Sequence, residues 1–132
     1  HIKHGELLKV YLDTLTTKQV YFIRGKVEVD EREKIKEIME KDSNVICIAI
    51  SAIFSTGINI KNIHNIVFAA GGKSFVRTVQ SIGRGLRKHN TKDKLVIFDI
   101  CDRLRYGIRH SDKRKEIYDT EKIKYIEKTL VE

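Results

Sequence analysis

The amino-acid sequence predicts an α/β fold in which helices flank a parallel β-sheet and a further helix is added at the C-terminus. Two observations lead to this prediction. Four short β-branched runs are apolar almost throughout, as expected for strands covered on both faces. Segments with helical apolar spacing lie between or beside them, and this alternation is typical of a parallel sheet. The predicted strands are residues 20–23, 45–50, 66–69 and 95–100.

Apolar residues at helical spacing define the predicted helices. In the first segment these residues are Leu8, Tyr11, Leu12 and Leu15. Asp30 and Glu33 have the spacing of a capping box, which predicts a helix that opens at Asp30 and turns Ile35, Ile38 and Met39 inward. Ser74 is placed to cap a helix that runs to about residue 88. A terminal helix is predicted from about residue 111, with apolar positions at Ile117, Tyr118, Tyr125, Ile126 and Leu130.

Composition places the chain in a broad class. Its 132 residues are 41% hydrophobic and 33% charged, which predicts one soluble globular domain and excludes disorder. No apolar run approaches the roughly 18–20 residues of a membrane span, so we expect no membrane partner. Because the chain begins with His1 rather than Met, we expect it to be a piece of a longer protein. Cys47 and Cys101 lack CxxC spacing, which predicts free buried thiols in a reducing cytoplasm, with a disulfide or a metal site as the alternative.

The basic charge is concentrated in one part of the chain. The formal net charge is +8, and residues 71–94 contribute seven basic side chains against one acidic one, a net +6. Such a stretch favours a polyanion partner, either the phosphates of a nucleotide, those of a nucleic acid, or both. A solvated basic face is the alternative interpretation.

An incomplete phosphate-binding loop follows the third predicted strand. Residues 69–74 (AAGGKS) lead from this strand into a predicted helix. The full pattern GxxxxGK[ST] also needs a glycine five residues before Gly72, and Val67 stands there. We therefore expect a glycine turn rather than a nucleotide P-loop, with Lys73 as a candidate phosphate contact.

One face of the helix predicted after Ser74 is suited to an anion. Gln80, Gly83, Arg84 and Arg87 fall within a sector of about 100° when placed on a helix. The core-facing stripe is separate and consists of Phe75, Val79, Ile82 and Leu86. Arginines three residues apart present permanently charged forks that match phosphate oxygens. This face predicts an anion site, with close helix–sheet packing as the other explanation for its glycines.

Three segments together carry a resemblance to a known family. Residues 80–87 (QSIGRGLR) resemble motif VI, QxxGRxxR, of superfamily 2 helicases. Residues 51–60 (SAIFSTGINI) are similar to motif V of that family, and residues 22–25 (FIRG) are similar to the segment around motif IV. The segments occur in the family's order. Residues 55–69 and 73–89 most resemble the UvsW-type recombination helicases of T-even phages.

The resemblance implies a RecA-like fold and the second of two motor domains. In this family the first domain carries the P-loop and the DExx box, and this chain has neither. Residues 1–110 would form the helicase C-terminal RecA-like domain, and residues 111–132 would be its C-terminal helical extension. ATP with Mg²⁺ would be bound mainly by the N-terminal RecA-like domain of the same polypeptide. This chain alone would therefore not hydrolyse ATP.

The resemblance also implies roles for individual residues. Arg84 and Arg87 would be catalytic arginine fingers, which stabilise charge on the transferred phosphoryl group. Residues bordering the nucleotide would be Gln80, Gly57, Asn59 and Gly83. Residues holding DNA phosphates would be Ser51, Ser55, Thr56, Lys73, Arg24 and Gly25. Two departures from the family pattern are Asn59, where motif V usually has Asp, and Val29, where many relatives have Gln; no nucleic-acid contact is assigned to Arg32.

The implied function is the second motor domain of an ATP-dependent DNA helicase or translocase. Its partners would be branched, forked or R-loop DNA and the N-terminal helicase domain. Two alternatives stay open: a nucleic-acid-binding module without ATP chemistry, and a small α/β protein that binds a nucleotide or phosphometabolite. A Walker A motif and a DExx box upstream in the parent reading frame would favour the helicase. We expect a cytoplasmic protein, in the host cell if a phage encodes it, and no metal site at His1 and His4.

Overall fold

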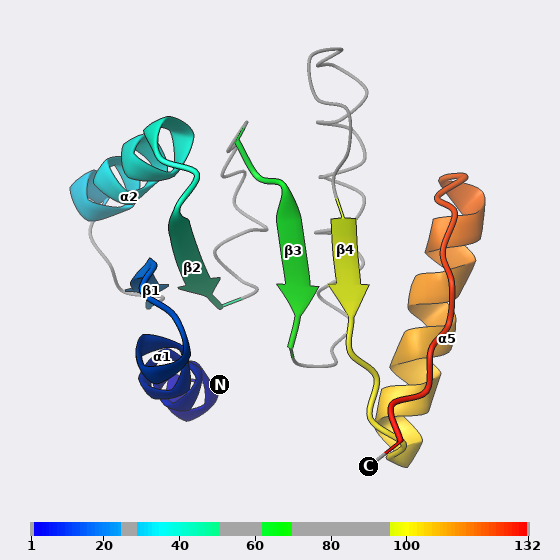
Figure 1. The fold of residues 1–132 in the computed structure, drawn as a ribbon. Coiled ribbons are helices and arrows are strands. Elements are labelled where there is room, and N and C mark those ends of the chain that lie inside the picture. The colour runs from blue at the N-terminus through cyan, green and yellow to red at the C-terminus, as the bar shows by residue number, and fades with distance from the viewer. Residues whose placement is uncertain (1, 25–28, 51–61, 70–95, 132) are drawn as a thin grey trace. The chain divides into compact units, whose positions relative to one another are not determined.

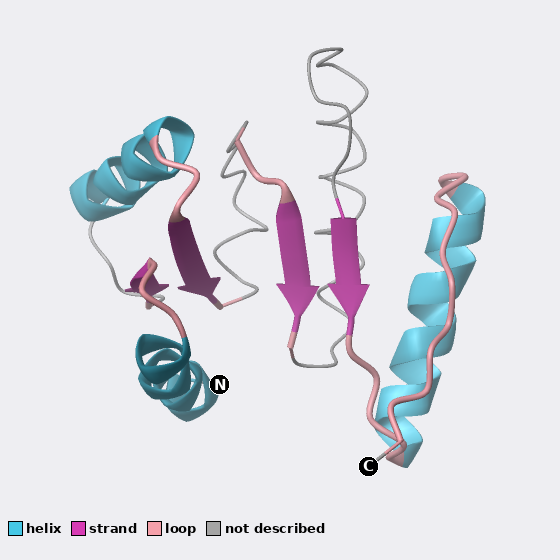
Figure 2. Ribbon diagram, viewed as in Figure 1, coloured by secondary structure: helices cyan, strands magenta, loops and turns pink. Residues whose placement is uncertain are grey.

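A computed structural model describes residues 2–24, 29–50, 62–69 and 96–131. These ranges contain both helices and parallel strands (Figures 1 and 2), which confirms the predicted α/β class. Each of the four strands lies within one residue of its predicted bounds. The chain divides into two compact units, residues 1–66 with 93–96 and residues 67–92 with 97–132. The elements are α1 (Ile2–Leu15), β1 (Gln19–Ile23), α2 (Val29–Lys41), β2 (Val45–Ala49), β3 (Asn65–Phe68), β4 (Val96–Asp99) and α5 (Arg105–Thr120).

Strands β1 and β2 form a parallel pair at the centre of the first unit. Their register places Val20 opposite Ile46 and Ile23 opposite Ala49. Ile23 packs with Ile35 of α2 in a small core, and the half-buried hydrophobic residues around them are Tyr21, Met39, Cys47, Ala49 and Ile50. The predicted inward orientation of Ile35 is confirmed. On α1 the predicted apolar stripe is only partly covered, because Leu8 and Leu12 are half-buried while Tyr11 and Leu15 are exposed.

Helix α1 approaches β1 closely because Gly5 has no side chain. A Cβ atom on Gly5 would lie 2.5 Å from Cζ of Phe22, so any larger residue would displace the ring or the helix. Gly5 is the buried residue of α1. Next to Gly5 on α1, Glu6 reaches Arg24, the residue directly after β1.

The start of α2 differs from the predicted capping box. The helix begins at Val29, so Asp30 lies inside its first turn rather than at the cap. The Glu33 carboxylate lies 4.0 Å from Nζ of Lys36, one turn ahead. Asp30 and Glu31 still place negative charge in the first turn, where the helix dipole favours it.

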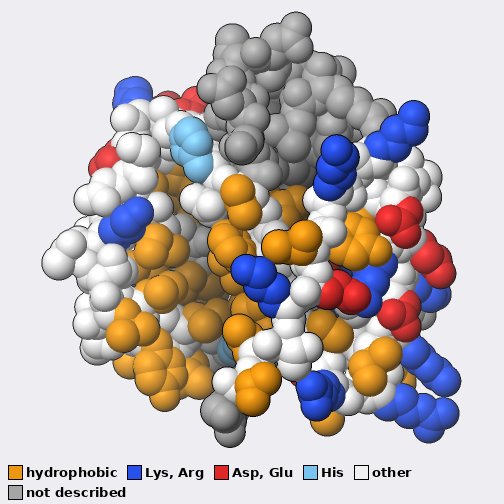
Figure 3. Space-filling model, turned by 45° about the vertical axis from the view of Figure 1, so that its right-hand side comes forward, with side chains coloured by type: hydrophobic (Ala, Val, Ile, Leu, Met, Phe, Trp, Pro, Cys, Tyr) orange, Lys and Arg blue, Asp and Glu red, His pale blue; other side chains and the backbone are white. Residues whose placement is uncertain are grey.

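Strands β3 and β4 form a second pair. The amide of Val96 donates to the carbonyl of His64 at 3.0 Å, and that of Ile100 donates to Phe68 at 3.2 Å. Both bonds join residues 32 positions apart, as in a parallel ladder, and both arrows point the same way in Figure 1. Phe68 is buried, but Val67 and Phe98 are more than half exposed. The expectation that both faces of the strands are covered is therefore wrong for β3 and β4. Figure 3 shows hydrophobic side chains exposed at the surface.

The terminal helix differs most from its prediction. Helix α5 begins six residues before residue 111 and ends at Thr120 rather than continuing to residue 131. Beyond its end, the amide of Lys122 donates to Asp119 at 3.1 Å and that of Ile123 donates to Tyr118 at 2.8 Å. These two bonds make a Schellman motif, and Lys122 takes its left-handed position with φ of 56°. Residues 123–131 are not helical and run back along α5 (Figure 1).

Two contacts hold the returning segment against α5. The rings of Tyr118 and Tyr125 lie 5.7 Å apart between centroids. Glu127 forms an ion pair with Lys115 on the helix. The apolar positions at Tyr125, Ile126 and Leu130 therefore belong to this segment and not to a helical face.

We expect Lys122→Gly to raise the free energy of unfolding by up to about 1 kcal/mol. A lysine in the left-handed region places its Cβ close to the following carbonyl oxygen, whereas glycine takes this conformation without that penalty. Urea denaturation monitored by circular dichroism measures the change. Lys124→Gly is the control, because Lys124 lies in the same segment without a positive φ. An equal change in both variants would contradict the argument.

Candidate functional site

Of the predicted site residues, Arg24 alone lies in the part of the chain that the structure describes. The predicted roles of the others stay predictions, since these residues lie outside the described ranges: Gly25, Ser51, Ser55, Thr56, Gly57, Asn59, Lys73, Gln80, Gly83, Arg84 and Arg87. The helix predicted after Ser74 and the glycine turn before it also lie outside these ranges.

Two parallel strands bring Arg24 to the edge from which the predicted motif V segment departs. Ile23 is the last residue of β1 and pairs with Ala49, the last residue of β2. Arg24 and Ile50 therefore follow neighbouring strands at the same edge of the pair, and Ile50 directly precedes Ser51. In open α/β sheets ligands bind at the carboxyl ends of the strands. This edge is the candidate site.

The Arg24 side chain is held by two neighbours. Its Nη2 atom lies 2.9 Å from Oε1 of Glu6 on α1. Its guanidinium carbon lies 5.4 Å from the centroid of the Phe22 ring, within range of a cation–π contact. The Arg24 and Glu6 side chains are 56% and 44% exposed, and ion pairs this exposed contribute about 1 kcal/mol or less. A phosphate can therefore compete with Glu6 for Arg24.

The chain that follows β4 is fixed to the first turn of α5. Asp102 accepts a hydrogen bond from the amide of Leu104 at 3.0 Å through Oδ1. Gly107 makes room for this carboxylate, because a Cβ atom at that position would lie 2.0 Å from the same oxygen. Asp102 thus holds the turn that leads into α5, whose N-cap residue is Leu104.

A buried polar cluster joins the end of β4 to the middle of α5. Arg114 is 1% exposed. Its Nε and Nη2 atoms donate to the two carboxylate oxygens of Asp99, at 2.7 and 2.8 Å. The hydroxyl of Tyr118 donates to Oδ2 of Asp99 at 2.7 Å. These three hydrogen bonds attach α5 to the end of β4.

Sequence reasoning did not find this cluster. The face that α5 buries consists of Gly107, Ser111, Arg114 and Tyr118, spaced at helical intervals but mostly polar or small. A search for apolar periodicity passes over such a face. The available signal was the apolar strand ending in Asp99, followed by an arginine and a tyrosine four residues apart.

The cluster shifts the pKa of two of its members. Burial, followed by the hydrogen bond to Asp99, raises the pKa of Tyr118, so its hydroxyl stays a donor at neutral pH. Burial alone would lower the pKa of Arg114, but the hydrogen bond and charge of Asp99 outweigh it and the pKa is raised. Both pKa shifts favour the protonated forms of Tyr118 and Arg114, which donate hydrogen bonds to Asp99.

The described ranges hold two free thiols. Cys47 is half-buried, whereas Cys101 is exposed, so the prediction of a buried thiol is wrong for Cys101. Burial raises the pKa of the Cys47 thiol to about 11, so the thiol is protonated at neutral pH and is a poor nucleophile. Within these ranges no group of three His, Cys, Asp or Glu side chains is placed to hold a metal ion. None of the helices described is both long and apolar enough to span a membrane.

Comparisons with known proteins agree with the sequence resemblance. The family described as helicase conserved C-terminal domain matches residues 3–89. The ATP-dependent DNA helicase uvsW of Enterobacteria phage T4 is 32% identical over 148 aligned residues, which cover 98% of this chain and 29% of that protein. The crystal structure of T4 UvsW matches with a TM-score of 0.68 at 31% identity and covers 92% of this chain and 28% of that one.

A second solved structure supports the fold alone. The C-terminal part of the Fun30 ATPase domain matches with a TM-score of 0.71 at 18% identity, over 90% of this chain and 39% of that one. The RecA-like fold and the resemblance to UvsW-type helicases are confirmed. The chain spans 29% of the length of the curated relative. Because the family match covers about two thirds of its residues, the chain belongs to the helicase conserved C-terminal domain family.

Proposed function

We propose that this chain is the second motor domain of an ATP-dependent DNA helicase or translocase that acts on branched or paired DNA. The observation that carries the proposal is the ordered series of motif-like segments on a RecA-like fold. Along the chain, residues 22–25 overlap and follow the end of β1, residues 51–60 come after β2, and residues 80–87 come between β3 and β4. Support comes from the relative at 32% identity, which is described as an ATP-dependent DNA helicase.

The proposal divides the work on ATP between two domains. An N-terminal RecA-like domain of the same polypeptide would bind ATP and Mg²⁺. The second motor domain, which is this chain, would present Arg84 and Arg87 to the γ-phosphate. Arginine fingers act by stabilising charge in the transition state and need only correct placement. Gln80, Gly83 and the Gly57–Asn59 pair would border the nucleotide.

The proposal assigns the DNA contacts to the edge that follows β1 and β2. Arg24 supports this assignment, because it is exposed and its partner Glu6 occupies the place that a phosphate oxygen would take. The loop with Ser51, Ser55 and Thr56 would add hydroxyl contacts, and Lys73 would add a charge. Contacts to phosphate fix the position of the protein on DNA but carry no sequence information. We therefore expect binding without sequence preference.

The binding half of the proposal is tested by fluorescence anisotropy with a mixed-sequence oligonucleotide. The logarithm of affinity is expected to fall with the logarithm of salt concentration, by about 0.7–0.9 for each phosphate contact. Arg24→Gln is expected to make this slope shallower by about one contact. Lys18→Gln removes an equal charge from an exposed position just before β1 and is the matched control. Affinity independent of salt, or equal effects of the two variants, would contradict the assignment.

We further propose that the protein works in the cytoplasm, in the host cell if a phage encodes it. Cys47 and Cys101 are both free thiols. Thiols of this kind persist in a reducing compartment.

A further inference from the structure

Residues 103–115 are densely basic, with six basic side chains and one acidic one, a net +5. The structure separates the six cations into two groups. Arg114 is buried against Asp99, and Lys115 pairs with Glu127 and lies 3.9 Å from Asp112. The other four are exposed and form no ion pair within the described ranges: Arg103, Arg105, Arg109 and Lys113.

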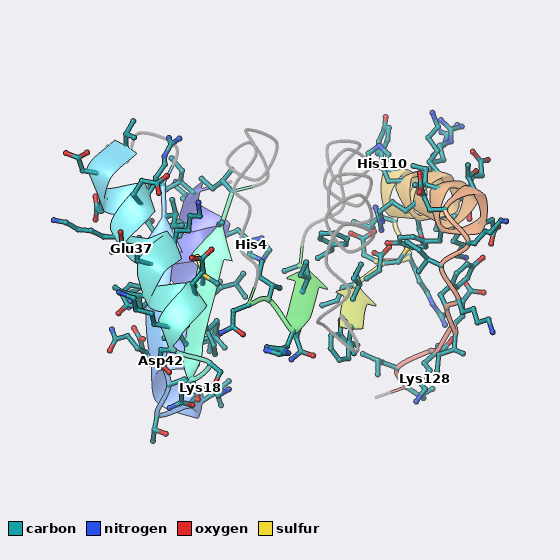
Figure 4. All side chains as sticks on the ribbon, turned by 90° about the horizontal axis from the view of Figure 1, so that it is seen from above. His4, Lys18, Glu37, Asp42, His110 and Lys128 are labelled. Carbon is teal, nitrogen blue, oxygen red and sulfur yellow. The ribbon has the colours of Figure 1, made fainter. Side chains whose placement is uncertain are left out.

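Three of the exposed cations share one strip of α5. Arg105, Arg109 and Lys113 are each four residues apart, so successive charges are separated by about 6 Å along the helix. The buried stripe that begins at Gly107 lies on the opposite side of α5. Figure 4 shows the side chains radiating from this helix, with His110 labelled among them. The strip therefore faces away from the contacts that pin α5 to β4.

The chemistry of this strip fits a nucleic-acid backbone. Two of its three cations are arginines, whose planar forks match phosphate oxygens. Tyr106 follows Arg105 and is 72% exposed, so it offers an aromatic face beside the charges. Glu116, one turn beyond Lys113, is the acidic residue at the end of the strip, while Asp112 is drawn toward Lys115. Three cations without an ion pair among the described residues are a candidate site for a polyanion.

We propose that Arg105, Arg109 and Lys113 form a phosphate-binding strip that holds the DNA backbone against α5. The strip is additional to the edge after β1 and β2, and it lies outside the basic stretch 71–94. The proposal rests on the proposed function, because it takes DNA as the polyanion. Since Arg114 pins α5 to β4, the strip stands on a rigid element, and its charges keep their spacing without a loop having to be ordered.

The test compares two triple variants of this chain that lose the same charge. One combines Arg105→Gln, Arg109→Gln and Lys113→Gln. The other combines Lys18→Gln, Lys34→Gln and Lys41→Gln, which removes three exposed cations from the first unit. The strip variant is expected to bind a mixed-sequence oligonucleotide at least about tenfold more weakly at low salt, with a slope shallower by about two contacts or more. The control is expected to change the slope by less than one contact.

The outcomes separate this proposal from the proposed function. If the unmodified chain shows no salt-dependent DNA binding, both fail. If it binds DNA and the two triple variants lose affinity equally, the strip is overturned and the proposed function stands. If polyglutamate of matched charge competes with DNA as well as unlabelled DNA does, the strip recognises an acidic protein instead. Melting temperatures are expected to stay unchanged in the strip variant, because the three side chains make no ion pair within the described ranges.

Discussion

Replacing Arg114 with methionine is expected to lower the free energy of unfolding by about 3–5 kcal/mol. Arg114 is 1% exposed and binds both carboxylate oxygens of Asp99. The variant leaves the Asp99 carboxylate with the Tyr118 hydroxyl but without a counter-charge, in a position where its side chain is 18% exposed. Loss of one partner from a buried pair costs more than the pair itself contributes. Urea denaturation followed by circular dichroism measures the loss.

Two further variants show whether the buried charge is the cause. Lys115→Met removes the neighbouring cation, whose ion pair with Glu127 is largely exposed, and is expected to cost less than about 1 kcal/mol. The double variant Asp99→Asn with Arg114→Met is expected to cost less than the sum of the two single variants, because no uncompensated carboxylate remains. If Arg114→Met is no more destabilising than Lys115→Met, the cluster does not hold α5.

Arg87→Ala in the full-length protein is expected to lower kcat for ATP hydrolysis by at least about 100-fold. The KM for ATP is expected to change much less, because a finger that acts on the developing charge binds the transition state more strongly than the ground state. Arg87→Lys is expected not to restore turnover, since an ammonium group cannot reproduce the planar fork. Steady-state ATPase assays with saturating DNA measure both constants.

A structural role for Arg87 predicts a different result. Lys92→Ala removes a cation from the same basic stretch, beyond the predicted helix, and is the control for a general effect of charge. Arg84→Ala is expected to behave like Arg87→Ala, and the folded state is expected to survive both changes. An Arg87→Ala protein with normal turnover and a much lower melting temperature would show that Arg87 is a structural ion-pair residue and not an arginine finger.

The strands and the family could be predicted from the sequence because their signals are local. The continuous β-branched runs that became β1 and β2 contain their own pattern, and the structure changed their ends by one residue at most. The motif-like segments could also be recognised from the sequence, because each of them spans ten residues or fewer. The structure places Arg24 at the edge after β1 and β2, because these two strands are parallel and in register.

The tertiary structure decided what depends on partners distant in the chain. Arg24 meets Glu6, which is 18 residues away on another element. Helix α5 buries Arg114 and Tyr118 because Asp99 lies 15 and 19 residues before them, and a polar face of this kind carries no hydrophobic period. The same contacts determine which cations of residues 103–115 are neutralised and which face solvent. Charge and spacing are properties of the sequence, but neutralisation depends on long-range packing, which brings each opposite charge into reach.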